Sequence, residues 1–238
     1  MSVYTIPQYF AGNTYPGRGV LLGLTPDGQQ AVAAYFIMGR SVNSRNRIFV
    51  PNQDSVQILP FDASLVSDPS LIIYFPIRVW KDQTIVTNGD QTDTVYQGLQ
   101  AGGTFQSALA SRTYEPDAPN YTPRISGLLC RRPTFSYQLS ILKRENESGA
   151  CGRYLYTYEP TPGLGHLIHT YQQDGTPLPS FCGEPVALVV PQDIKECTQT
   201  LWDALDPENK VALAVRYLNL ADGSYQQQIV NTHQEVSL

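Results

Sequence analysis

The sequence predicts an α+β fold, and three observations lead to this class. Most of the chain consists of short runs rich in Val, Ile, Tyr and Phe, the residues favoured in strands. Gly, Pro, Asn or Asp bound most of these runs, as is typical of strands joined by tight turns. Only two stretches, 94–112 and 192–206, carry apolar residues at helical spacing. Many strands with few helices predict large antiparallel sheets covered by helices.

The strand-like runs follow one another along the whole chain. In order they are 19–25, 31–40, 47–52, 55–61, 71–80, 84–89, 124–130, 134–144, 153–159, 165–173, 185–191, 211–220 and 225–233. The first helical stretch follows the run at 84–89, and we expect Thr92, Asp93 or Thr94 to cap it. Asp193 is the expected N-cap of the second, because its carboxylate can accept from the first free N–H groups.

Length and composition indicate one compact domain spanning residues 1–238. The chain is 42% hydrophobic and 16% charged, so it can form a core that supports a buried site. No internal repeat, linker or low-complexity segment interrupts it.

The negative net charge of the chain excludes some classes of binding partner. A formal net charge of −5 argues against a nucleic-acid or membrane-surface protein, because those partners require a broad basic face. The N-terminus lacks the pattern of a signal peptide, and Pro76 and Arg78 break the longest apolar run. We therefore expect a cytoplasmic protein.

Cysteine and histidine residues do not indicate a metal site. The four cysteines are far apart without a C-x-x-C pair, so we expect reduced, buried thiols. His166 and His169 are three residues apart in a strand-like run, and such side chains point to opposite faces of a sheet. We expect both histidines to be structural.

The most unusual segment is 35–50, where Arg40, Arg45, Arg47 and Asn46 lie in eight residues between two apolar runs. One interpretation is a solvated turn. However, three arginines without a lysine suit bidentate recognition of phosphate or carboxylate better than simple solubility. We interpret the segment as an anion-binding turn.

Three further segments have a similar character. Arg18 lies between two glycines before a strand, where a ligand could approach the backbone closely. Segment 87–93, TNGDQTD, combines an Asn-Gly hairpin-type turn with two carboxylates, although a turn and a helix cap would explain most of it. Segment 113–127 carries Glu115 and Arg124 on a loop stiffened by three prolines, which can hold a carboxylate in place.

Taken together, YFIMGRSVNSRNR, TNGDQTD and TYEPDAPNYTPRI resemble, in order and spacing, segments of the archaeal-type inosine monophosphate (IMP) cyclohydrolases. The resemblance covers about residues 15–127. It implies a four-layer αββα sandwich similar to N-terminal nucleophile hydrolases. It also implies closure of 5-formamidoimidazole-4-carboxamide ribonucleotide (FAICAR) to IMP plus water, the last step of de novo purine biosynthesis. Neither a cofactor nor a metal is implied.

The same resemblance places the catalytic residues at Arg47, Tyr74 and Glu115. In the implied roles, Glu115 is the base at the carboxamide, Tyr74 is the acid near the formyl oxygen, and Arg47 stabilises the oxyanion or orients the base. Without the resemblance, we would interpret Tyr74 as a tyrosine on a half-buried strand and Glu115 as an exposed carboxylate in a loop.

The candidate substrate-binding residues are polar side chains near those motifs: Arg18, Arg40, Arg45, Asn46, Asn88, Asp93 and Arg124. The first three are candidates for the ribose phosphate, and Asn88 and Asp93 for the base or ribose. For Arg124, an ion pair with Asp117 or Glu115 is an equal alternative.

Two other functions remain open. An amidohydrolase with an N-terminal nucleophile would depend on Ser2, and a non-catalytic purine nucleotide-binding protein would keep the arginines without needing Glu115 or Tyr74. Under the favoured hypothesis the partner is a small purine ribonucleotide, and we expect a homo-oligomer.

Overall fold

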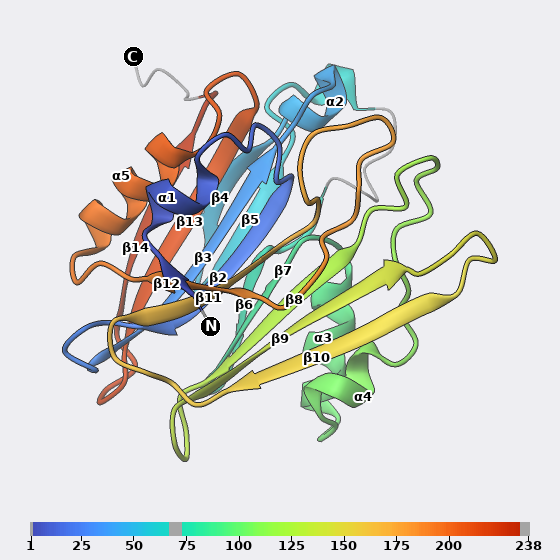
Figure 1. The fold of residues 1–238 in the computed structure, drawn as a ribbon. Helices are drawn as coiled ribbons and strands as arrows, with labels where there is room; N and C mark the ends of the chain where they lie inside the picture. The colour runs from blue at the N-terminus through green and yellow to red at the C-terminus, as the bar shows by residue number, and fades with distance from the viewer. Residues whose placement is uncertain (1, 67–72, 234–238) are drawn as a thin grey trace.

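The computed structural model describes residues 2–66 and 73–233, and two seven-stranded sheets dominate it (Figure 1). In spatial order, sheet A contains β1 (Val3–Tyr4), β12 (Val186–Val189), β11 (Leu164–His169), β2 (Arg18–Leu24), β3 (Gln30–Met38), β13 (Lys210–Asn219) and β14 (Tyr225–Asn231). Sheet B contains β10 (Cys151–Tyr158), β9 (Ser136–Arg144), β8 (Arg124–Cys130), β7 (Gln83–Thr87), β6 (Ile77–Trp80), β5 (Ser55–Leu59) and β4 (Ile48–Asn52). Only β1 and β12 pair in parallel among the described strands. The predicted α+β class is confirmed.

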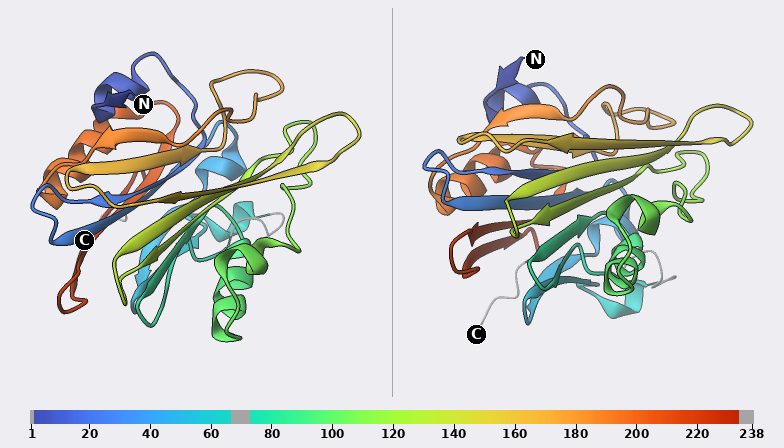
Figure 2. Two further views of the ribbon diagram at one scale, coloured as in Figure 1. Left: turned by 60° about the horizontal axis from the view of Figure 1, so that its bottom comes forward. Right: turned by 90° about the horizontal axis from the view of Figure 1, so that it is seen from below.

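Helices cover the outer faces of both sheets. α1 (Ile6–Phe10) and α5 (Ile194–Ala204) share an apolar cluster with sheet A. α3 (Gln91–Gln100) and α4 (Phe105–Leu109) share another with sheet B, and Figure 2 shows them on the side away from sheet A. The remaining helical turns are α2 (Val42–Arg45) and the 3₁₀ turn η1 (Ala63–Leu65).

The main core lies between the two sheets. Val20 and Leu22 of β2 face sheet B in this core, whereas Leu21 faces the helices α1 and α5. Because both faces of the central strands are buried, their sequences are continuously apolar and do not alternate with polar residues. One end of this inter-sheet space holds the candidate site.

The predicted helix 94–112 is two helices with different bounds. The chain breaks at Gly102, whose φ of +80° favours glycine, so α3 and α4 are separate. The predicted cap is wrong: the N-cap is Asp90, without a side-chain capping bond, and Thr92 donates to the Phe75 carbonyl instead. The cap of α5 is confirmed, because Asp193 accepts from the N–H groups of Lys195 and Glu196 at 2.8 and 3.0 Å.

Two short helices were not predicted, and one predicted strand is shorter than expected. α1 and α2 lie outside the two predicted helical stretches, and each begins with a capping box, Thr5 with Gln8 and Ser41 with Ser44. In the predicted strand 71–80, residues 71 and 72 lie outside the described residues, and strand structure begins only at Ile77. The capping boxes of α1 and α2 satisfy free N–H groups at the start of each helix. Such short helices do not need a repeating apolar pattern, so the spacing of apolar residues did not predict them.

The histidines occupy opposite faces of β11, as predicted. The His166 ring bonds to the Tyr137 hydroxyl in the inter-sheet core, at 2.7 Å. The His169 ring bonds to the Tyr9 hydroxyl of α1 on the outer face, at 2.5 Å. Burial lowers the pKa of both imidazoles to about 4, so both stay neutral at pH 7.

The cysteines are free, but the expectation that all are buried is wrong. Cys197 is buried, Cys130 and Cys151 are partly buried, and Cys182 is exposed. Within residues 2–66 and 73–233, no group of three or more His, Cys, Asp or Glu side chains is placed to hold a metal ion. No helix of that part of the chain has the length and apolar character needed to cross a membrane.

Candidate active site

The arginine-rich segment is a helical turn between β3 and β4. Ser41 caps this turn, α2, and the Nε of Arg45 donates back to the Gly39 carbonyl at 2.9 Å. Arg40, directly before the turn, forms an ion pair with Asp174 at 2.5 Å. The three arginines therefore have different surroundings: Arg40 and Arg45 are exposed, whereas Arg47 is buried.

Arg47 is the most unusual side chain of the site. It is 6% exposed, and its Nε and Nη1 have no hydrogen-bond partner among the described residues. Burial and then the nearby positive charge of Arg18 lower its pKa. A buried guanidinium with free donors is costly unless an electron-rich group binds there.

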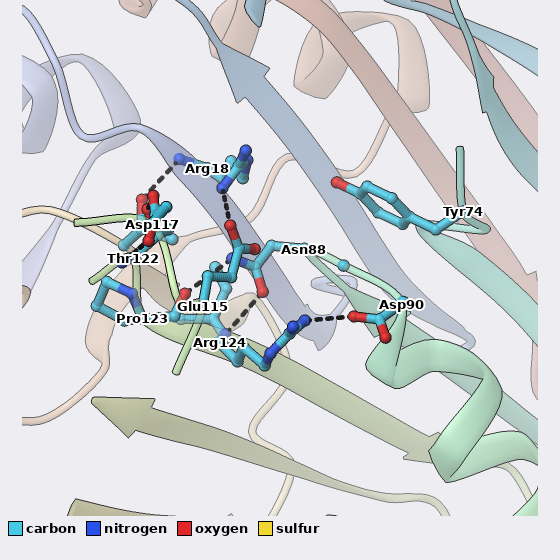
Figure 3. A network of polar contacts seen from close by, with 12 residues as sticks. Arg18, Tyr74, Asn88, Asp90, Glu115, Asp117, Thr122, Pro123 and Arg124 are labelled. Carbon is cyan, nitrogen blue, oxygen red and sulfur yellow. Dashed lines mark hydrogen bonds and ion pairs between the residues drawn. The ribbon is translucent and has the colours of Figure 1, made fainter. Parts of the chain in front are cut away.

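Glu115 and Arg18 form the second part of the site. Their Oε2 and Nη1 atoms are 3.6 Å apart, and Glu115 is only 7% exposed (Figure 3). The Glu115 N–H donates to the Thr122 carbonyl, which closes the proline-rich loop on itself. Burial raises the pKa of the Glu115 carboxyl, although Arg18 and then Arg124 act in the opposite direction. The alternative interpretation of Glu115 as an exposed loop carboxylate is therefore wrong, because the side chain is buried.

Tyr74 completes the group that the structure brings together. Its ring is buried, and its hydroxyl points toward Arg18 in Figure 3. The Tyr74 hydroxyl lies 2.8 Å from that of Tyr35 on β3. Burial raises the pKa of Tyr74, whereas Arg18 and Arg47 lower it. A phenol, a carboxyl group and two guanidinium groups therefore lie close together between the sheets.

A cavity of about 260 Å³ opens beside Arg18. It is lined by four segments of the sequence: Tyr15, Gly17 and Arg18; Met38, Arg40, Ser41 and Ser44; Asp117, Asn120 and Thr122; Tyr171 and Leu178. Two guanidinium groups and several hydroxyls in one hollow suit an anionic, hydroxyl-bearing ligand.

The glycines around Arg18 lie against neighbouring side chains of the protein. A side chain at Gly17 would meet the Thr170 hydroxyl at 2.3 Å, and one at Gly19 would meet the Phe36 ring at 2.2 Å. These glycines therefore admit neighbouring side chains of the protein itself, and Gly17 also lines the cavity beside Arg18. The close approach of a ligand to the backbone here stays a prediction.

Two predicted asparagines are engaged with the backbone. Asn46 exchanges two hydrogen bonds of 2.7 Å with the N–H and carbonyl of Asp62. Asn88 donates to the Pro123 carbonyl at 2.8 Å and accepts from the Ile125 N–H at 2.9 Å. Asn88 and Gly89 connect β7 to α3, so the Asn-Gly pair is a strand-to-helix connection and not a hairpin turn.

Two predicted charged residues have other partners than expected. Arg124 pairs with Asp90 at 2.6 Å and not with Asp117 or Glu115 (Figure 3). Asp93 forms an ion pair with Arg78 and is exposed. Arg124 is thus held by Asp90 and Gln91, whereas Asp93 is held by Arg78.

Three site residues were not found from the sequence. Tyr35, Thr122 and Tyr171 bond to the candidate residues or line the cavity. With 15 tyrosines in the chain, no local pattern separates Tyr35 or Tyr171 from the others. Ser2, by contrast, is exposed directly before β1 at the edge of sheet A.

Comparison with known proteins shows the family to which the chain belongs. The sequence profile of a family described as IMP cyclohydrolase-like protein matches residues 15–223, well beyond the motifs in the first half. The IMP cyclohydrolase of Methanopyrus kandleri is 32% identical over 161 residues, which cover 66% of this chain and 75% of the relative. That of Methanococcus maripaludis strain C7 is 32% identical over 163 residues, 65% of this chain and 79% of the relative. The chain therefore belongs to the family of IMP cyclohydrolase-like proteins.

Proposed function

We propose that this protein is an IMP cyclohydrolase, which converts FAICAR to IMP and water. The observation that carries the proposal is the buried Arg47 guanidinium, whose Nε and Nη1 have no partner among the described residues. It lies with Arg18, Tyr74 and Glu115, so an electron-rich, anionic substrate would satisfy its donors. The family relationship and the similarity to named IMP cyclohydrolases support the choice of reaction.

Ring closure joins two groups of one molecule. The carboxamide nitrogen attacks the formyl carbon, a C–N bond forms, and the electron pair of the C=O bond moves to oxygen. The carboxamide nitrogen loses one proton, and the formyl oxygen takes up two protons and departs as water. The formamide nitrogen then loses its proton as it forms the C=N bond of the new ring. Because the reacting groups are already tethered, orientation matters more than capture.

In this mechanism Glu115 takes the proton from the carboxamide nitrogen. Its raised pKa suits a general base, since a more basic carboxylate accepts a proton more readily. Tyr74 donates a proton to the formyl oxygen, and Arg47 stabilises the negative charge that develops there. General acid–base assistance of this kind contributes roughly 10² to 10⁴ in rate.

The ribose phosphate would occupy the 260 Å³ cavity. Arg18 and Arg40 line this cavity, and Arg45 lies on the same turn. Guanidinium groups bind phosphate oxygens through paired, charge-assisted hydrogen bonds. Asn46, Asn88 and Arg124 would hold the loops that carry the site, and Asp93 would act only from a distance.

The order of layers, with α1 and α5 outside sheet A and α3 and α4 outside sheet B, supports a likeness to N-terminal nucleophile hydrolases. In this proposal Ser2 has no catalytic role, because it is exposed at a sheet edge. We further propose one domain over residues 1–238, a homo-oligomer and a cytoplasmic location.

The test is conversion of FAICAR to IMP by the purified protein without added metal or cofactor, followed by absorbance. Glu115→Gln and Arg47→Ala should lose turnover, whereas Arg153→Ala, which bonds to the carbonyls of Leu109 and Arg112 outside the site, should keep it. IMP binding without turnover by the parent protein would instead indicate a binding protein. Activity that depends on Ser2 would indicate an amidohydrolase.

A further inference from the structure

A chain of three side chains leads from the proline-rich loop to the wall of the cavity. The Asp117 carboxylate accepts from both the N–H and the hydroxyl of Thr122. The Thr122 hydroxyl also lies 2.5 Å from the Tyr171 hydroxyl, which comes from the segment after β11. The three polar groups are therefore connected in a fixed order.

The Asp117 carboxylate determines which hydroxyl donates and which accepts in this series of hydrogen bonds. An ionised carboxylate only accepts hydrogen bonds, so the Thr122 hydroxyl must donate its proton to Asp117. Its oxygen is then free to accept, and the Tyr171 hydroxyl must be the donor to it. Burial raises the pKa of Tyr171 to about 12, so the phenol has a proton to donate at neutral pH.

Tyr171 has a fixed place in the cavity wall. Its ring stacks on that of Tyr15, with centroids 6.0 Å apart and planes at 17°, and both rings line the cavity with Arg18 and Arg40. Since its proton points to Thr122, only the lone pairs of its oxygen can face a ligand. The wall at this point accepts a hydrogen bond and does not donate one.

We propose that Tyr171 is a specificity-determining residue that accepts a hydrogen bond from a ribose hydroxyl of the nucleotide. This inference rests on the proposed function, which puts a ribonucleotide in the cavity. The guanidinium groups of Arg18 and Arg40 bind anionic oxygens, such as those of a phosphate. The Tyr171 oxygen instead needs a hydrogen-bond donor, and the ribose hydroxyls of a ribonucleotide are such donors. Asp117 and Thr122 act as positioning residues that fix the direction of the phenol.

The experiment compares binding of IMP with binding of its 2′-deoxy and 3′-deoxy analogues by calorimetry. The parent protein should bind one analogue about three- to tenfold more weakly than IMP, the range for one neutral hydrogen bond. Tyr171→Phe keeps the ring but should bind IMP and that analogue equally. Tyr137→Phe, whose hydroxyl bonds to His166 away from the cavity, should keep the parent's preference.

A second pair of variants tests the direction of the chain and does not alter the Tyr171 ring. Thr122→Ser retains the hydroxyl and should keep the preference, whereas Thr122→Val frees the phenol proton and should reduce it. Equal binding of all three nucleotides by the parent, or an unchanged preference in Tyr171→Phe or Thr122→Val, overturns this inference alone. Failure of IMP to bind the parent at all overturns the proposed function and the inference with it.

Discussion

The hydroxyls of Tyr35 and Tyr74 lie 2.8 Å apart in the core between the sheets. Tyr35 is fully buried on β3, and its ring stacks on Phe49 at a centroid distance of 5.6 Å. If Tyr74 gives up its proton during catalysis, Tyr35 is placed to donate to the resulting phenolate. Stacking holds Tyr35 in position before the proton is transferred.

Tyr35→Phe should therefore lower kcat by roughly 10- to 100-fold, since a hydrogen bond to a charged group contributes about 1.5 to 3 kcal/mol. In a Tyr74→Phe background the same change should have no further effect. Steady-state kinetics of the two single variants and the double variant measure this coupling. Additive losses would show that Tyr35 acts independently of Tyr74.

Replacing Arg47 by Met should separate activity from stability. The change removes a buried charge with free donors, so the free energy of unfolding should rise by about 1 to 3 kcal/mol while kcat falls about 10²- to 10³-fold. Urea unfolding and FAICAR turnover measure the two effects. Arg153→Met, outside the site, is the matched control and should change neither quantity appreciably. A destabilised Arg47→Met would contradict the interpretation of Arg47 as unpartnered.

Glu115 should make both activity and stability depend on pH. Burial raises its pKa above the ordinary 4.5, so between 4.5 and the raised value the folded protein binds more protons than the unfolded chain. The free energy of unfolding of the parent should therefore fall, relative to Glu115→Gln, as pH rises through this window. kcat/KM of the parent should rise over the same window, because the base must be ionised. Parallel stability curves for the two proteins would rule out this titration.

The cap of α5 should affect stability without affecting catalysis. Asp193→Ala removes the acceptor for two free N–H groups and should cost about 1 kcal/mol. Because α5 covers the outer face of sheet A, kcat should be unchanged. Asp203→Ala, on the exposed side of the same helix, should stay within about 0.5 kcal/mol in thermal unfolding. An equal loss in both variants would mean that capping is not the cause.

Local sequence determined the features that depend on nearby residues. Strand-rich composition predicted the α+β class, and the spacing of apolar residues predicted α5 together with its cap at Asp193. The motifs around Arg47 and Glu115 indicated the family that the profile match shows. In each case the relevant physical preference, such as strand propensity or helix capping, acts within a few residues.

Tertiary structure alone decided which side chains meet. The central strands are buried on both faces, so their sequences are apolar throughout and do not show which face a given side chain occupies. The contact between Tyr35 and Tyr74 could therefore not be predicted from them. Likewise Tyr171 reaches Thr122 across 49 residues of chain, and Asn88 is engaged by backbone groups of a neighbouring strand. Such contacts depend on strand order and register, which are set by packing between distant segments. The sequence therefore determined the class of fold and the candidate motifs, and the packing of the two sheets determined the site.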